Sequence, residues 1–124
     1  MTMRFVPVAG AAFVLSMTAP AFAHHGWGGY QDTLSDIYGT VEYVSLNGAH
    51  AKMKLRGTDG NIWDVVMSPP YMTSSVGIKE MTIPTGAKIK AHGHRHRDTN
   101  RFEFKTEQIT MGEKTISLYP GRRE

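Results

Sequence analysis

Short stretches in which hydrophobic and polar residues alternate follow one another along the chain from about residue 37 onward. The clearest covers residues 49–56 (AHAKMKLR), where every second side chain is apolar and the side chains between them are polar or charged. This period of two is typical of a β-strand that buries one face and exposes the other. Comparable patterns predict strands over residues 37–46, 62–67, 87–93 and 102–109, with a last short strand around Ile116 and Leu118.

Turn and helix signals divide these strands. Asp59-Gly60 supplies the positive φ angle that a hairpin turn requires between the second and third strands. Pro69 and Pro70 favour the start of a short helix over residues 71–76, with Gly77 as its end. Short strands about ten residues apart, with one helical piece after the third, are typical of a small barrel. We therefore expect residues 36–124 to form a mainly β domain, a small antiparallel OB-like barrel of five to six strands with one short helix.

The alternation also predicts which side chains face the solvent. In the strand over residues 87–93, apolar positions 87, 89 and 91 are expected to face the core and the polar positions to face outward. His94 and His96 continue that outward face if the strand runs on. In the next strand two phenylalanines are expected in the core, opposite three outward-facing charges: Phe102 and Phe104 against Arg101, Glu103 and Lys105.

The first 23 residues have the parts of a secretory signal peptide. Arg4 precedes an apolar run over residues 5–17, and Ala21-Phe22-Ala23 is a cleavage site with small residues at its first and third positions. The run is too short to span a bilayer, which needs about 20 apolar residues. Cleavage after Ala23 is the preferred interpretation, with cleavage after Ala21 as the alternative. Residues 24–35 are then expected to form an irregular arm on a soluble periplasmic or secreted protein without a transmembrane anchor.

Composition narrows the function classes. A chain of 124 residues has room for one domain. The absence of cysteine excludes disulfides, thiolate metal sites, iron–sulfur clusters and a thiol nucleophile. A formal charge of +3 is too small for a dedicated nucleic-acid binder, and that ligand is scarce outside the cytoplasm. The sequence has no Gly-x-Ser-x-Gly elbow and no phosphate-loop motif, so an enzyme is not favoured, although a Ser–His–acid triad stays open.

Histidine is the feature that points to chemistry, because all six histidines lie after the predicted cleavage site. Cleavage after Ala23 would give His24 both a free α-amine and an imidazole, which together form a nitrogen chelate suited to copper. His25 adjoins it, and His50 becomes a third ligand if the arm folds back over its strand. The alternative is that Ala-Phe-Ala-His-His is only a cleavable sequence with a polar start.

A second cluster consists of His92, His94 and His96. On a strand, residues two apart share a face and lie about 6.6–6.8 Å apart, so their imidazoles can lean onto one metal ion. The neighbouring cations oppose this interpretation, and a solvated polar face near a turn is the alternative: Lys88, Lys90, Arg95, Arg97 and Arg101.

The mature chain resembles a group of small exported bacterial proteins of unknown function. The motifs that carry the resemblance are Ala23-His24-His25, Gly39-Thr40-Val41-Glu42-Tyr43-Val44, Asn47-Gly48-Ala49-His50-Ala51, Trp63 and the strand over 86–93. The group usually has proline before the histidine of the third motif, where this sequence has Gly48-Ala49, and its pattern lacks the His94-Arg95-His96 extension. The resemblance implies an OB-like barrel and a site built from His24, His25 and His50, and it supplies no activity. The plan is also similar to exported OB-fold copper chaperones at the level of fold.

We therefore expect an exported soluble metal-binding protein that handles copper through His24 and His25 with His50, with a second set in His92, His94 and His96. Its partners would be the metal ion and another periplasmic protein, and not nucleic acid. One alternative is a non-metal envelope binding or assembly module that uses the barrel face. A mono-copper redox enzyme is a third hypothesis, although removing residues 1–23 leaves 101 residues and little room for a substrate face.

Overall fold

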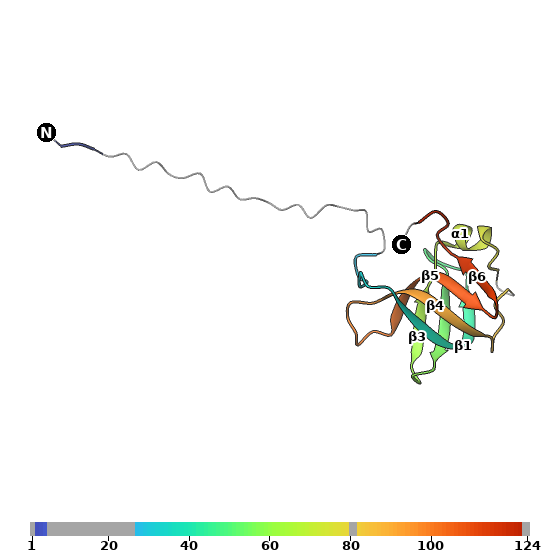
Figure 1. Cartoon of the computed structure of the whole chain (residues 1–124). Helices are drawn as coiled ribbons and strands as arrows, with labels where there is room; N and C mark the ends of the chain where they lie inside the picture. Colours follow the sequence, from blue (N-terminus) through green and yellow to red (C-terminus); the bar gives the residue numbers. More distant parts are fainter. Residues whose placement is uncertain (1, 5–26, 80–81, 123–124) are drawn as a thin grey trace.

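The computed structural model describes residues 2–4, 27–79 and 82–122 (Figure 1). Residues 27–122 contain six strands and one short helix, in the order β1 (Ser35–Ser45), β2 (Lys52–Gly57), β3 (Ile62–Val66), α1 (Pro70–Ser75), β4 (Lys88–Arg95), β5 (Glu103–Met111) and β6 (Lys114–Ser117). No helix in the described residues is long and apolar enough to cross a membrane.

The strands form one sheet in the order β3-β2-β1-β4-β5-β6, and an additional pairing of β3 with β5 closes β1–β5 into a barrel. The β3–β5 pair is parallel, whereas the other five pairs are antiparallel. Strand β6 pairs with β5 outside the closed barrel. The expected small OB-like barrel of five to six strands with one short helix is therefore confirmed.

Strand β1 is long enough to pair with two neighbours. Its residues 39–45 pair with β2 and its residues 35–40 pair with β4, with a register shift between Val41 and Tyr43 that bends the strand. Both neighbours pair with β1 at Gly39, and β2 comes so close that a Cβ atom there would lie 2.4 Å from the carbonyl oxygen of Arg56. This close approach requires glycine and lets one strand turn the corner of the barrel.

The predicted turn and helix are both confirmed. Gly60 has a φ of +84° in the β2–β3 hairpin, and the Asp59 carboxylate accepts a hydrogen bond of 3.2 Å from the indole N–H of Trp63. Helix α1 begins at Pro70, which contributes no N–H of its own to the first turn. The helix is followed by Gly77 at a φ of +94°.

The core of the barrel consists of the apolar positions of the alternating strands, as the sequence predicts for residues 49–67. Fully buried side chains include those of Met53, Leu55, Val65, Met67 and Phe104. Met53 and Met67 therefore pack in the interior, which is the default role of a core methionine.

Three predicted exposures are wrong. Lys105, expected on the outside, has 1% of its surface exposed, because the arm covers this face of β5 and the centroid of the Trp27 ring lies 5.0 Å from its Nζ. Phe102, expected in the core, precedes β5, is 37% exposed and packs edge-on against Trp63 at 5.3 Å. His94, expected to face the solvent, is 8% exposed, because the arm lies over it: its ring meets Trp27 at 5.5 Å and its Nδ1 lies 2.8 Å from the Gln31 carbonyl.

Candidate functional site

The described part of the arm lies along the end of β4. Tyr30 forms an isolated antiparallel bridge with His96, and the Gln31 N–H donates to the Arg95 carbonyl at 2.8 Å. Figure 1 shows this light-blue segment reaching the barrel before β1 begins. Backbone hydrogen bonds therefore fix the arm from Trp27 onward to one end of the barrel.

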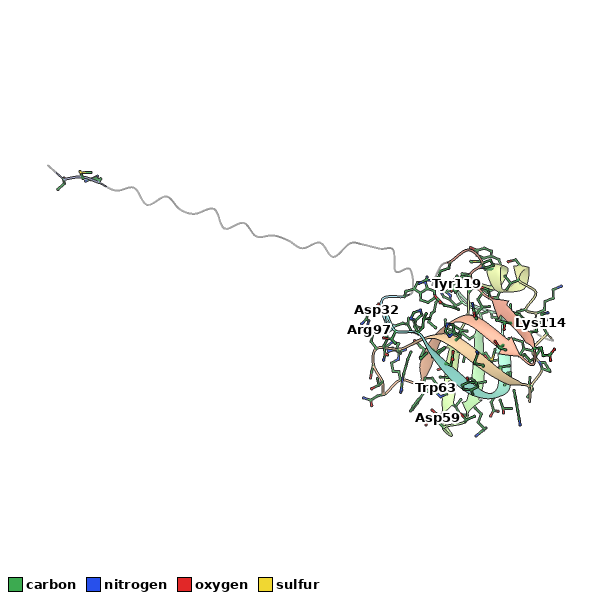
Figure 2. All side chains as sticks on the ribbon, in the orientation of Figure 1. Asp32, Asp59, Trp63, Arg97, Lys114 and Tyr119 are labelled. Atoms are coloured by element: carbon green, nitrogen blue, oxygen red, sulfur yellow. The ribbon has the colours of Figure 1, made fainter. Side chains whose placement is uncertain are left out.

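Side-chain contacts strengthen this attachment. Asp32 and Arg97 lie beside each other where the arm meets the barrel (Figure 2), and their side chains form a salt bridge of 3.4 Å. The Arg97 N–H also donates to the Gly29 carbonyl at 2.8 Å. Both Arg97 and Asp32 are exposed, so their ion pair contributes little to stability and the backbone bonds set the position of the arm.

Trp27 is the centre of a cluster at this end of the barrel. Its ring meets His94 edge-on at 5.5 Å and Tyr119 at 5.3 Å between ring centroids. Two cations lie near its face, with Arg122 Cζ at 4.1 Å and Lys105 Nζ at 5.0 Å from the ring centroid. Cation–π attraction of this kind contributes about 0.5–2 kcal/mol for each pair. We call the following five residues the arm-proximal cluster: Trp27, His94, Lys105, Glu107 and Arg122.

His94 follows Gly93, a residue at which β4 and β5 come very close together. A Cβ atom on Gly93 would lie 2.1 Å from the Lys105 carbonyl oxygen, so only glycine allows β4 and β5 to approach this closely at the register shift. The His94 Nδ1 then lies 2.8 Å from the Gln31 carbonyl, which can only accept, so Nδ1 carries a hydrogen. In the neutral ring this leaves a lone pair on Nε2, which faces Glu107 Oε1 at 3.5 Å.

Glu107 supplies a buried carboxylate to the cluster. Its side chain is 7% exposed, and the Arg122 Nε donates to its Oε1 at 2.7 Å. A buried carboxylate requires a paired cation, and Arg122, itself 44% exposed, provides one from the C-terminal segment. His94 Nε2 and Arg122 Nε thus approach the same carboxylate oxygen, Oε1.

Lys105 connects the cluster to His50. The Lys105 Nζ lies 3.3 Å from His50 Nδ1, and the same nitrogen lies 3.0 Å from the Met67 carbonyl. The Met67 carbonyl can only accept, so a hydrogen bond to it requires a hydrogen on His50 Nδ1. The Lys105 nitrogen can accept from that same N–H only as a neutral amine, because an ammonium group can only donate. Burial lowers the pKa of Lys105 to about 8. Burial and then the charge of Lys105 also lower the pKa of His50.

The sequence predicts His50 on the polar face of a strand. In the structure His50 instead precedes β2 and lies in a bend. There it lines a cavity of about 370 Å³ together with Lys52, Lys105, Glu103 and Tyr30. The Tyr30 hydroxyl donates to Glu103 Oε2 at 2.7 Å on the same wall.

The three histidines of β4 and its continuation do not converge. His92 Nδ1 lies 2.7 Å from Asp36, whereas His94 faces Glu107. His96 Nδ1 accepts from the Asp98 N–H at 3.0 Å, and its Nε2 lies 3.8 Å from Glu103. The three imidazoles therefore have separate partners and do not lean onto one point, because the arm covers His94 while His92 and His96 pair with other groups.

His24 and His25 lie outside the described residues, as do the predicted cleavage site and nearly all of the predicted signal peptide. Among residues 2–4, 27–79 and 82–122, no group of three or more His, Asp or Glu side chains is placed to hold a metal ion. His50 and His94 are the two imidazoles that the structure connects to Trp27, His94 directly and His50 through Lys105.

Sequence reasoning missed Lys105, Glu107 and Arg122. The alternation along their strand predicts that Lys105 faces the solvent, and it gives no role to Glu107. Arg122 lies in a short C-terminal segment that has no periodic pattern. A single sequence gives one usable signal, the run of polar residues over 105–108 within an otherwise strand-like segment. That run is too polar for a β-strand buried on one side unless its polar groups have buried partners.

The profile of a family of unknown function, DUF6152, matches residues 11–120 of the chain. No curated protein matches it. The expected resemblance to a group of small uncharacterised proteins is confirmed at this level, while export and the Ala-His-His start stay predictions.

Proposed function

The chain belongs to the DUF6152 family, and from its own residues we propose that it is an exported protein that binds copper at the arm end of the barrel. The ligands are the α-amine and imidazole of His24, the imidazole of His25 and one imidazole of the barrel. His94 is the first choice for that last ligand and His50 the second. In this proposal the protein stores, delivers or buffers the metal and does not convert a substrate.

The observation that carries this proposal is the position of Trp27. Its ring contacts His94 at 5.5 Å, and His25 precedes it by only two residues in the sequence. Two residues of extended chain span at most about 7 Å, and the three residues from His24 to Trp27 span at most about 11 Å. The proposal therefore requires only a short length of chain to bring the His24-His25 pair to the end of the barrel at which His94 lies.

His94 has the hydrogen bonding that metal-binding histidines have in proteins. One ring nitrogen, Nδ1, donates to a backbone carbonyl at 2.8 Å, which leaves Nε2 as the nitrogen with the lone pair. In that neutral form the lone pair faces the Glu107 carboxylate at 3.5 Å, and the two repel each other. A metal cation on Nε2 would lie beside this carboxylate and remove the repulsion.

His50 offers a second imidazole on the other side of Lys105. Its Nδ1 faces the Met67 carbonyl at 3.0 Å, which again leaves Nε2 for a ligand. Its cavity of about 370 Å³ has room for an additional side chain. The nearby Lys52 and Lys105 oppose a cation there, which is why His94 is preferred.

The cations that oppose a metal site in the sequence are mostly neutralised or remote in the fold. Arg97 pairs with Asp32 and Arg101 pairs with Glu103. The Arg95 guanidinium lies 5.1 Å from the centroid of the Trp63 ring. Lys88 and Lys90 line a different cavity from those that His50 and His94 line.

Copper suits the available donors better than other divalent metals. The chain has no cysteine, so any soft-metal site is built from imidazole, amine and thioether groups. Cu(II) binds nitrogen ligands more tightly than the other first-row divalent ions do. An α-amine with a pKa of about 7.7–8.0 loses its proton to a metal far more readily than a lysine does.

Purified processed protein, with its first residue established by intact mass, tests the proposal. Calorimetric titration with Cu(II), and with Cu(I) under a reductant, is expected to show one tight site. Acetylation of the α-amine or His24→Ala should weaken it at least about a hundredfold, a loss of about 2.7 kcal/mol. Weak binding that neither change affects would overturn the proposal.

A further inference from the structure

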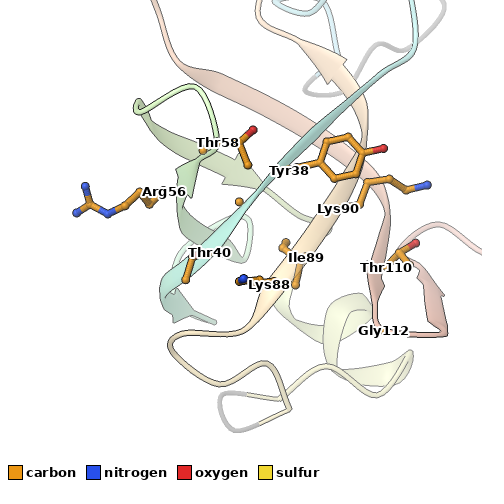
Figure 3. A pocket seen from close by; sticks show the side chains of 11 residues that line it. Tyr38, Thr40, Arg56, Thr58, Lys88, Ile89, Lys90, Thr110 and Gly112 are labelled. Atoms are coloured by element: carbon orange, nitrogen blue, oxygen red, sulfur yellow. The ribbon is translucent and has the colours of Figure 1, made fainter.

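A second cavity, an open groove of about 650 Å³, lies on the outer surface of the barrel (Figure 3). We name it the outer groove. It shares no lining residue with the arm-proximal cluster. Side chains of four strands line it, among them Tyr38, Thr40, Arg56, Lys88, Lys90 and Thr110.

Strand register arranges these side chains in two rows across the sheet. In one row Tyr38 on β1 pairs with Lys90 on β4, which pairs in turn with Thr110 on β5. In the other row Thr40 lies between its partners Arg56 on β2 and Lys88 on β4. Cross-strand partners have Cβ atoms about 4.5–5.5 Å apart, so each row is a continuous line of functional groups.

The groove is positively charged without internal compensation. None of its lining residues is Asp or Glu. Arg56 donates to Glu42 at 2.6 Å, at the rim. Among the described residues, no carboxylate forms a salt bridge with Lys88 or Lys90, so the net charge of the lining is that of two unpaired ammonium groups. Such a surface attracts an anionic ligand.

The groove also offers an aromatic ring and hydroxyl groups. Tyr38 is 53% exposed, and Figure 3 shows its ring and the Lys90 side chain extending the same way from neighbouring strands. Thr40, Thr58 and Thr110 supply hydroxyls that both donate and accept hydrogen bonds. An aromatic face for a sugar ring, hydroxyls for its hydroxyls and ammonium groups for a carboxylate are together in one place.

We propose that the outer groove binds an acidic polysaccharide, a chain of sugar rings that bear carboxylates. This proposal is independent of copper binding. Platforms for single-stranded nucleic acid stack successive bases on several aromatic rings, whereas this groove has one. Ile89 is the one aliphatic side chain in the lining and is only 4% exposed, so the groove offers no protruding aliphatic group to insert into a membrane.

Calorimetry or affinity electrophoresis with an oligogalacturonate and the purified protein tests this. We expect binding that weakens steeply between low and physiological salt, since the contacts are exposed ion pairs. A neutral oligosaccharide of the same length should bind at least about tenfold more weakly. A double substitution Lys88→Ala/Lys90→Ala and the single substitution Tyr38→Ala should each reduce affinity at least about tenfold.

The chain provides matched controls. Tyr43 lies on the same strand with the same exposure of 53% but outside the groove, and Lys114 is an exposed lysine on β6. Tyr43→Ala and Lys114→Ala should leave affinity unchanged. The proposal is overturned if the oligogalacturonate does not bind or if the control variants weaken it as much as the groove variants do. It is equally overturned if single-stranded DNA or anionic vesicles bind more tightly than the glycan and depend on the same residues.

Discussion

The two halves of β4 differ in a way that explains both sites. Before Gly93 the strand alternates, and Lys88 and Lys90 extend into the solvated outer groove. After Gly93 the register shifts, and His94 lies against the arm and β5 with 8% of its surface exposed. The same strand therefore carries charge that water solvates at one end and polar groups that need protein partners at the other.

Burial gives the two regions different energetics. An exposed charge contributes little to stability and is free to bind a ligand. A buried polar group must find a partner, and its loss costs about 1–3 kcal/mol. Lys105, Glu107 and His94 are buried and have named partners, which makes the arm end the region where single substitutions have the larger effects.

The largest expected effect comes from the residue that separates the two halves. Gly93→Ala places a Cβ atom 2.1 Å from the backbone oxygen of Lys105, and backbone cannot move aside cheaply. We expect a loss of about 2–4 kcal/mol in the free energy of unfolding, measured by urea denaturation. Gly29→Ala, whose nearest neighbour is a His96 side-chain atom at 3.4 Å, is the control and should change little. Equal losses in both variants would mean that the register shift does not depend on glycine.

The pH dependence of stability tests whether Lys105 is buried as a charged group at a cost. Its pKa is about 8 in the folded protein and 10.5 without burial, so between these values the unfolded chain binds more protons. The free energy of unfolding of the metal-free protein should therefore rise with pH from 8 to 10.5, by about 1–3 kcal/mol relative to Lys105→Met. Taking the difference between the two proteins cancels tyrosine titration, such as that of Tyr119, whose pKa burial raises to about 12. A difference that is flat with pH would show that Lys105 is solvated.

Trp27 tests whether the arm is held by the cluster. Trp27→Ala removes contacts with His94, Tyr119 and Arg122 and should cost about 2 kcal/mol, roughly half of what truncating a fully buried tryptophan costs. Hydrogen exchange should quicken at the Gln31 amide, whose bond to Arg95 fixes the arm, and stay slow in β2. Unchanged protection at Gln31 would mean that the backbone bonds hold the arm without the indole.

The smallest effects are expected in the outer groove. Lys88→Ala and Lys90→Ala remove charges that form no salt bridge among the described residues, so stability should change by less than about 0.5 kcal/mol. Thermal unfolding at low salt measures this, with the Lys105→Met variant as the contrast. A large loss of stability in either groove variant would show that the two ends of β4 do not differ in this way.

Sequence reasoning found the fold wherever one face of a strand meets the core and the other meets water. Met53, Leu55, Trp63 and the Asp59-Gly60 turn follow that rule, as does the helix after Pro70. Strand β5 breaks it because Trp27 of the arm and Arg122 of the C-terminal segment cover its outer face, and alternation along the strand indicates burial on one face only. A register shift and a second covering layer are tertiary facts, so a single sequence cannot place such residues.

The candidate site was only partly predictable for the same reason. The sequence indicates that His50 and His94 are possible ligands, but the predicted ladder of His92, His94 and His96 does not include the arm, which covers His94. The carboxylate of Glu107, the cation of Arg122 and the amine of Lys105 come from β5 and the C-terminal segment. Nothing in their local sequence indicates that they meet the arm at Trp27.

Copper affinity in two matched histidine variants tests the central claim most directly. His94 and His92 lie on the same strand, on either side of Gly93, and His94 alone of the two contacts Trp27 among the described residues. We expect His94→Ala to weaken Cu(II) binding to the processed protein at least about tenfold, and His92→Ala to change it less than about twofold. Equal affinities in both variants and the unmodified protein, or a loss confined to His92→Ala, would contradict it.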